Sequence, residues 1–199
     1  GACAPAALAR LVERLAAQRV LLVASTSLSL ATDEFAELQS ALGSNFAGLL
    51  NGIGPHTPRA DVMRTLEAAR DADADLLVSL GGGSIIDACK VVQLAIDQGV
   101  ESQAQLIEYA QYGDGTRGSK YADFSHFKGD SKIRQVAIPT TLSGAEFSNN
   151  ASVLNTEISA KEGYRGIDLC PQTIIYDPQL SLHTPQWLWL STAIRSLDH

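Results

Sequence analysis

Three consecutive glycines directly after a short apolar segment constrain the fold of this chain more than any other feature. Residues 76–80 read Leu-Leu-Val-Ser-Leu, which is typical of a strand buried inside a parallel sheet. The glycines at 81–83 end that strand, and the apolar spacing after them predicts a helix. We therefore predict a strand, a glycine turn and a helix capped by Ser84, with Asp87 at the capping-box position.

The glycine turn is a candidate phosphate site. The first N–H groups of a helix lack intrahelical acceptors, and glycines let an anion approach them closely. A glycine in regular structure costs about 1 kcal/mol relative to alanine, so three in succession suggest a use. The turn matches neither a Walker A loop nor a Gly-x-Gly-x-x-Gly fingerprint. A tight turn without a ligand remains the alternative.

Composition bounds the class of protein. A chain of 199 residues with 45% hydrophobic content can bury one substantial core. Its net charge of −7, with dispersed Lys and Arg, argues against a nucleic-acid surface. No apolar run approaches the ~18 residues of a membrane span, so we expect no membrane association. The few cysteines have no paired spacing, which fits a reducing compartment and predicts a cytoplasmic protein.

Short apolar segments alternate with helical patterns, and this alternation favours an α/β fold with a mainly parallel sheet and flanking helices. Besides residues 76–80, the strand candidates are residues 19–24, 46–50, 134–138, 151–154 and 173–176. Helical patterns cover residues 5–18, 33–42, 84–97 and 102–109. Two further helices would be opened by Thr57-Pro58 and by Thr184-Pro185, with Thr57 as the N-cap of the first. We predict polar, aperiodic loops at residues 111–132 and 155–166.

Other strand ends carry further candidate ligand residues. Ser25 follows the strand at 19–24, where an acidic residue often holds the ribose of a dinucleotide. A neutral residue would not repel a 2′-phosphate, so NAD and NADP both stay open. His56 lies in a loop, where it could touch a ligand or simply be solvated. Hydroxyls and a glycine follow the strand at 134–138, so residues 139–146 are a second candidate ligand turn, which we expect to meet the glycine turn at the carboxyl edge of the sheet. The alternative is a helix capped by Ser143, with Glu146 completing a capping box, and the two interpretations are compatible.

Several motifs together resemble the iron-containing (group III) alcohol dehydrogenase family. The family's first cofactor motif is similar to residues 81–90, which read Gly-Gly-Gly-Ser-x-x-Asp-x-x-Lys. Its second cofactor motif is similar to residues 139–146, which read Pro-Thr-Thr-x-x-Gly-x-Glu. Residues 54–58 and 141–146 are most similar to the maleylacetate reductase branch.

The resemblance implies a domain organisation. Residues 1–182 would form a Rossmann-like dinucleotide-binding domain of the dehydroquinate synthase-like fold. Residues 183–199 would be the first helix of an all-helical domain that continues beyond this sequence. The start also looks short relative to the family, so we expect a truncated chain. A homodimer stays open.

The resemblance also implies a cofactor site. The pyrophosphate of NAD or NADP would lie at Gly82, Gly83 and Ser84, with further residues near the ribose and nicotinamide. Lys161 resembles a cofactor-side lysine, with a solvated loop lysine as the alternative. The candidate cofactor-binding residues are Ser25, His56, Gly82, Gly83, Ser84, Asp87, Thr140, Thr141, Leu142 and Lys161.

One departure from the family pattern concerns the metal. Iron-dependent members carry Asp-x-x-x-His on the last helix, where this chain has Arg195 and His199. Arginine has no lone pair to donate, so His199 is the single metal candidate, with iron or zinc as the metal to consider. Arg195 could instead bind a substrate carboxylate, or be a surface arginine.

The function implied is an NAD(P)-dependent oxidoreductase that reduces a small carbonyl or maleylacetate-like substrate by hydride transfer. Lys161, Arg195 and His199 are the candidate catalytic residues, which would polarise the substrate oxygen or supply a proton. A metal-dependent alcohol dehydrogenase of the same family is the first alternative. A non-catalytic nucleotide-binding module that needs a partner domain is the second.

Overall fold

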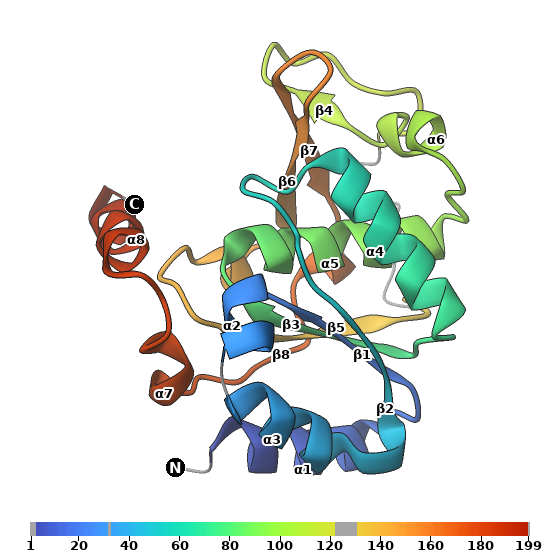
Figure 1. Ribbon diagram of the computed structural model, residues 1–199. Helices are drawn as coiled ribbons and strands as arrows, with labels where there is room; N and C mark the ends of the chain where they lie inside the picture. Colours follow the sequence, from blue (N-terminus) through green and yellow to red (C-terminus); the bar gives the residue numbers. More distant parts are fainter. Residues whose placement is uncertain (1–2, 32, 122–130, 199) are drawn as a thin grey trace.

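A parallel five-stranded sheet forms the centre of the molecule (Figure 1). The computed structural model describes residues 3–31, 33–121 and 131–198. Every pairing in this sheet is parallel, in the order β2-β1-β3-β5-β8. The strands are β1 (Val20–Ala24), β2 (Phe46–Leu50), β3 (Leu76–Gly81), β5 (Arg134–Pro139) and β8 (Thr173–Ile174). The predicted α/β class with a mainly parallel sheet is confirmed.

Helices cover both faces of this sheet, because successive strand side chains point to opposite sides. Leu21 and Leu77 pack against α4 (Arg59–Asp71) and α5 (Gly83–Asp97). Leu22 and Val78 pack against α1 (Ala4–Leu15) and α3 (Asp33–Leu42) on the other face. Figure 1 shows these two helical layers above and below the strands.

A second sheet lies beyond α5 and was only partly predicted. It is antiparallel and contains β4 (Gln111–Tyr112), β7 (Ala160–Arg165) and β6 (Asn150–Asn155). The prediction of a loop over residues 155–166 is wrong, because β7 pairs with β6 along its length. Its inward-facing positions are Glu162 and Tyr164, and a buried glutamate conceals the alternation expected of a strand. The predicted loop at 111–132 contains β4, and its residues 122–130 lie outside the described part.

An ion pair holds the second sheet to α4. Arg59 and Glu162 are both buried, with 2.6 Å between Nη1 and Oε1. The same carboxylate accepts hydrogen bonds from Asn155 Nδ2 and Tyr164 Oη at 2.9 and 3.0 Å. Because buried charges need partners, these donors make a polar contact tolerable in this otherwise apolar layer.

The predicted helix cap at Thr57 is wrong. Helix α4 begins at Arg59, and Pro58 is its N-cap residue. Thr57 is buried with φ at 57°, and its hydroxyl donates to the Ser84 carbonyl at 3.0 Å. The Thr57 side chain therefore ties the start of α4 to the start of α5 instead of capping its own helix.

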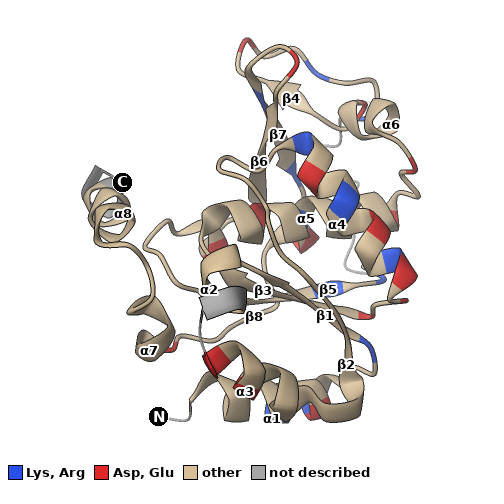
Figure 2. Ribbon diagram, in the orientation of Figure 1, with Lys and Arg blue, Asp and Glu red and all other residues tan. Residues whose placement is uncertain are grey.

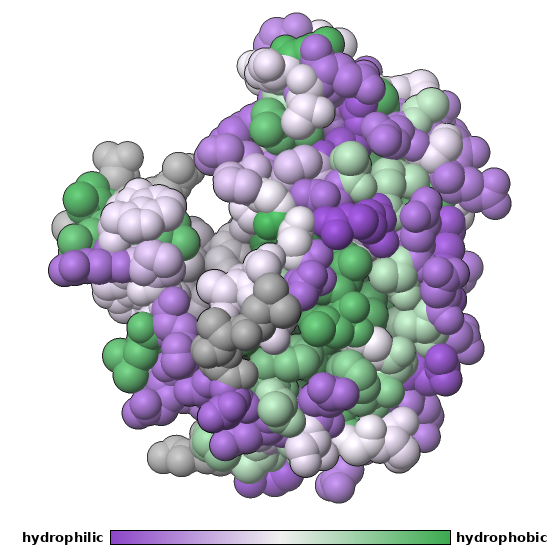
Figure 3. All heavy atoms as spheres, viewed as in Figure 1, coloured by the Kyte–Doolittle hydropathy of each residue, from purple (hydrophilic) through white to green (hydrophobic). Residues whose placement is uncertain are grey.

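Helices α7 (Pro178–Ser181) and α8 (Gln186–Asp198) lie at one side of the sheet, and Trp187, Leu190 and Ile194 are exposed on α8. The remaining short helices are α2 (Thr26–Ala31) and α6 (Gln103–Ile107). Figure 3 shows apolar surface on α8, at the left of the view.

Figure 2 shows acidic and basic residues interspersed, for example along α4. Within the described residues, no helix combines the length and apolar content that a membrane span requires.

Candidate functional site

The glycine turn joins β3 to α5 and leaves two helical N–H groups for a ligand. Gly81 has φ of 150°, and a Cβ added to it would lie 2.5 Å from Ile85 Cδ1, so only glycine fits there. The N–H groups of Ile85 and Ile86 both donate to the Gly82 carbonyl, at 3.0 and 3.3 Å. The two N–H groups before them, at the first turn of α5, have no intrahelical acceptor by geometry. This end of α5 is therefore suited to an anion.

Ser84 and Asp87 do not form the predicted capping box. Gly82 is the N-cap residue of α5, and no side-chain cap is present there. The Ser84 hydroxyl accepts a hydrogen bond from the His56 N–H at 3.0 Å. Asp87 Oδ2 accepts one from the Ser152 N–H at 3.0 Å. Both side chains thus fasten neighbouring segments to α5.

The second predicted turn lies directly against the first. The Thr140 N–H donates to the Gly81 carbonyl at 3.0 Å. A Cβ added to Gly82 would lie 3.1 Å from Thr141 Cγ2, and one added to Gly83 would lie 3.0 Å from Ser143 Oγ. The expectation that the two turns meet at the carboxyl edge of the sheet is confirmed. Residues 82 and 83 are glycines partly because the second turn packs so closely against them.

The helix predicted after Ser143 is absent. The segment forms a single 3₁₀ turn over Ala145–Phe147, and Gly144 has φ of 69°. Glu146 turns inward and accepts a hydrogen bond from Tyr176 Oη at 2.9 Å. Burial raises the pKa of Tyr176, and the Glu146 carboxylate acts in the same direction, so the phenol stays protonated. This pair had no signal in the sequence, because the two residues are far apart in the chain.

An unsatisfied hydroxyl lies beside the glycine turn. Thr141 is 6% exposed, and among the described residues its Oγ1 atom has no hydrogen-bond partner. That atom lies 3.4 Å from the position of a Cβ added to Gly82. Buried polar atoms are normally paired, so a lone hydroxyl next to free N–H groups fits a site for a polar ligand such as a dinucleotide phosphate.

The remaining cofactor candidates lie around the same turn. Ser25 follows β1, its N–H donates to the Leu80 carbonyl at 2.9 Å, and its Cβ lies 3.4 Å from a Cβ added to Gly81. His56 contacts Ser84 through its backbone, as described above. Lys161 is exposed on β7, and its positive charge acts to lower the pKa of Asp87, against the larger effect of burial. Their contact with a cofactor remains a prediction.

Two threonines attach the C-terminal part of the chain to the second turn: Thr184, just before α8, and Thr192, on it. The sequence did not single them out for this role. Thr184 Oγ1 donates to the Thr140 carbonyl at 2.6 Å, and the Leu142 N–H donates to Thr192 Oγ1 at 3.2 Å. Arg195 lies on α8, but its side chain is outside the described part, as is the whole of His199. The catalytic and metal assignments of these two residues are therefore untested.

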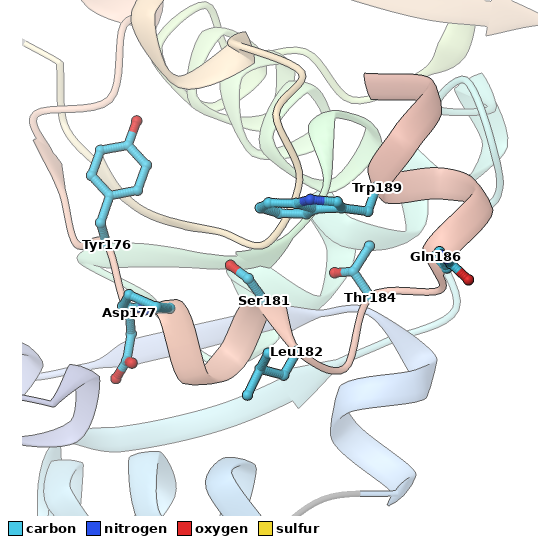
Figure 4. A pocket seen from close by; sticks show the side chains of 8 residues that line it. Tyr176, Asp177, Ser181, Leu182, Thr184, Gln186 and Trp189 are labelled. Carbon is cyan, nitrogen blue, oxygen red and sulfur yellow. The ribbon is translucent and has the colours of Figure 1, made fainter. Parts of the chain in front are cut away.

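An open cavity of about 690 Å³ lies between α7 and α8. Figure 4 shows the Trp189 side chain reaching from α8 over Ser181 toward Tyr176. Its lining residue Thr184 also bonds to the Thr140 carbonyl, while no residue of the glycine turn lines the cavity. Its lining residues are Tyr176, Asp177, Pro178, Ser181, Leu182, Thr184, Gln186 and Trp189.

The described residues do not by themselves provide a metal centre. Within residues 3–31, 33–121 and 131–198, no group of three or more His, Cys, Asp or Glu side chains is arranged to hold an ion. The residues around the glycine turn fit a dinucleotide better than a metal, because they offer N–H and hydroxyl groups and few anionic ligands.

Comparison with known sequences agrees with this geometry. The family model for iron-containing alcohol dehydrogenase matches residues 1–178. Dehydrogenase ALT3 of Alternaria alternata is 34% identical over 187 residues, which cover 91% of this chain and 45% of that protein. Maleylacetate reductase 2 of Cupriavidus pinatubonensis is 32% identical over 188 residues, which cover 94% of this chain and 41% of that protein.

Solved structures share the fold. Maleylacetate reductase from Agrobacterium tumefaciens gives a TM-score of 0.70 at 25% identity, covering 97% of this chain and 44% of that chain. Sulfoacetaldehyde reductase from Bifidobacterium kashiwanohense, in complex with NAD⁺, gives 0.80 at 18% identity, covering 99% and 48%. This chain spans less than half the length of these relatives. It belongs to the iron-containing alcohol dehydrogenase family.

Proposed function

We propose that this protein is part of an NAD(P)-dependent oxidoreductase that transfers hydride between nicotinamide and a small carbonyl or maleylacetate-like substrate. The observation that carries the proposal is the contact between the glycine turn and the Thr140–Leu142 turn at the carboxyl edge of the sheet. The family membership supports it, as do relatives named as a dehydrogenase and as maleylacetate reductases. The neighbour that binds NAD⁺ has the same fold.

The residues divide the cofactor site by position. The free N–H groups at the start of α5, contributed by Gly83 and Ser84, would hold the pyrophosphate. Ser25 and His56, beside the ends of β1 and β2, would contact the adenosine half. The turn at 140–142 would line the nicotinamide half. The nicotinamide supplies the hydride, and the protein holds and orients it.

The substrate side rests on residues toward the C-terminus. Arg195 would bind a substrate carboxylate, since a guanidinium suits two oxygens. Lys161 and His199 would polarise the carbonyl oxygen or supply the proton. We propose that residues 1–182 form the cofactor domain and that 183–199 begin a helical domain that faces it. Unpaired cysteines among the described residues support a cytoplasmic location.

Binding of reduced cofactor tests the proposal. NADH and NADPH are titrated separately into the purified protein while their fluorescence is recorded. Saturable binding of at least one of them at micromolar concentration is expected. A folded protein that binds neither would refute the assignment. Metal content, measured on the same sample before and after chelation, decides whether iron or zinc takes part.

A further inference from the structure

A fully buried lysine lies on α5, behind the glycine turn. Lys90 has no exposed surface, although lysine is rarely buried unless its charge is paired. It lies two helical turns after Gly83, on the side of α5 that faces the segment 145–150. Removing an ammonium from water is unfavourable, and burial lowers the pKa of Lys90 while Asp87 opposes that effect. The burial of Lys90 therefore needs an explanation from the contacts of its ammonium group.

The ammonium uses all three of its donors on one short segment. Lys90 Nζ donates to the Ala145 carbonyl at 2.6 Å, the Asn150 carbonyl at 2.7 Å and the Ser148 hydroxyl at 3.1 Å. Asp87 supplies a carboxylate oxygen at 3.4 Å. An ammonium has three N–H donors, so the charge is fully engaged. Hydrogen bonds from a charged donor are roughly twice as strong as neutral ones.

These contacts fix the end of the second turn. The turn begins at Thr140, whose N–H is held by the Gly81 carbonyl. It ends at Ala145, whose carbonyl is held by Lys90 and whose Cβ lies 3.6 Å from a Cβ added to Gly83. Both ends of the turn are thereby attached to the β3–α5 unit that carries the glycines. The buried Lys90 ammonium therefore provides the attachment at the Ala145 end of the turn.

We propose that Lys90 is a positioning residue that holds the Thr140–Leu142 turn against the glycine turn, and so fixes the surface on which the cofactor would lie. The effect on cofactor affinity rests on the proposed function. The effect on the backbone of the segment does not. Lys90 acts through this backbone and touches neither of the free N–H groups at the start of α5.

Gln93 provides a matched control. It is also fully buried on α5, three residues further along, but its amide donates to the Asp168 carbonyl and not to the segment 145–150. Lys90→Met and Gln93→Met each replace a buried polar side chain by an unbranched apolar one. Both should lower stability. Only the first should release the second turn.

The experiment combines amide hydrogen exchange of residues 141–150 with NADH titration. For Lys90→Met we expect exchange in this segment to accelerate at least about tenfold and the Kd for NADH to rise about tenfold, while Gln93→Met changes neither by more than about twofold. Equal behaviour of the two variants would overturn the positioning role. Faster exchange in a protein that binds no NADH even as wild type would instead refute the proposed function and leave the positioning role standing.

A milder variant covers the case in which Lys90→Met does not fold. Ser148→Ala removes one acceptor and keeps both charges of the Lys90–Asp87 pair. We expect exchange in residues 141–150 to accelerate about two- to threefold, with a matching rise in the Kd for NADH. Unchanged exchange and affinity in this variant would contradict the proposal.

Discussion

Gly82 lies so close to Thr141 that a Cβ added to the glycine would be 3.1 Å from the threonine Cγ2 atom. The two turns of the site are thus in van der Waals contact, and no side chain separates them. A ligand of the proposed site would therefore lie over this contact, beside the first N–H groups of α5, and not between the turns. The arrangement explains why the site needs small residues on one side and short polar residues on the other.

Replacing Gly83 should weaken cofactor binding. In Gly83→Ala the new methyl group would meet Ser143 Oγ at 3.0 Å and push the second turn outward. We expect the Kd for NADH to rise about tenfold, which corresponds to about 1.4 kcal/mol. Gly113→Ala is the control, because nothing lies within 4 Å of its added Cβ. Equal affinity in the two variants, measured by fluorescence titration, would count against the glycine turn as the binding element.

The Arg59–Glu162 pair should dominate the attachment of the second sheet. Arg59→Met leaves the buried Glu162 carboxylate without its cation, a change that costs about 3–5 kcal/mol in comparable sites. Arg64→Met is the control on the same helix, since Arg64 pairs with Asp61 and donates to the Asn51 and Gly52 carbonyls in exposed positions and should contribute less than about 1 kcal/mol. Urea unfolding of both variants measures the two losses. Similar losses of unfolding free energy in the two variants would show that the buried Arg59–Glu162 pair stabilises the protein no more than the exposed Arg64–Asp61 pair.

The buried thiol of Cys89 should make the protein less stable in alkali. Burial raises the pKa of Cys89 well above its ordinary value of 9.0. Above pH 9 the unfolded chain therefore loses a proton that the folded chain keeps, and the free energy of unfolding falls as pH rises. The slope from this group approaches about 1.4 kcal/mol per pH unit.

Subtraction isolates the thiol from other groups that titrate in alkali, including Tyr164 and Tyr176, whose pKa values are also raised. The unfolding free energy of the wild type minus that of Cys89→Ala should be constant below pH 8 and should decline above pH 9. A difference that does not vary between pH 7 and 10.5 would show that the thiolate is tolerated in the folded protein.

Ser25 offers a test of cofactor selection. The sequence left NAD and NADP open because a neutral residue follows β1, and Ser25 does lie beside Gly81. In Ser25→Asp the added carboxylate should repel a 2′-phosphate, raising the Kd for NADPH about tenfold and that for NADH by less than threefold. Ser25→Asn is the uncharged control. Equal changes for both cofactors would place the adenosine ribose elsewhere.

The elements that followed simple periodicity could be predicted from the sequence. Residues 76–80 form a central strand with both faces buried, so a nearly continuous apolar run, interrupted only by Ser79, identifies it. Strand β7 was missed because Glu162 occupies an inward position, and its partner Arg59 is far away in the sequence. A buried ion pair removes the hydrophobic signal on which the strand prediction depends.

The sequence predicted the two turns of the site, but it did not predict the hydrogen bonds that their side chains make. The two turns were found because glycines and hydroxyls follow strand ends. The predicted caps at Thr57 and Ser84 were wrong because these side chains bond between segments. The Ser143 hydroxyl does accept a local hydrogen bond from the Ala145 N–H at 3.4 Å, but only a 3₁₀ turn follows it. Local spacing cannot distinguish a cap from a contact with a distant segment, since both use the same residue types.

A crystal structure of the protein with NADH bound tests the central claim most directly. We expect pyrophosphate oxygens to accept hydrogen bonds from the N–H groups of Gly83 and Ser84, with the nicotinamide half along Thr140–Leu142. A cofactor bound instead in the cavity between α7 and α8, with no phosphate at the start of α5, would contradict it.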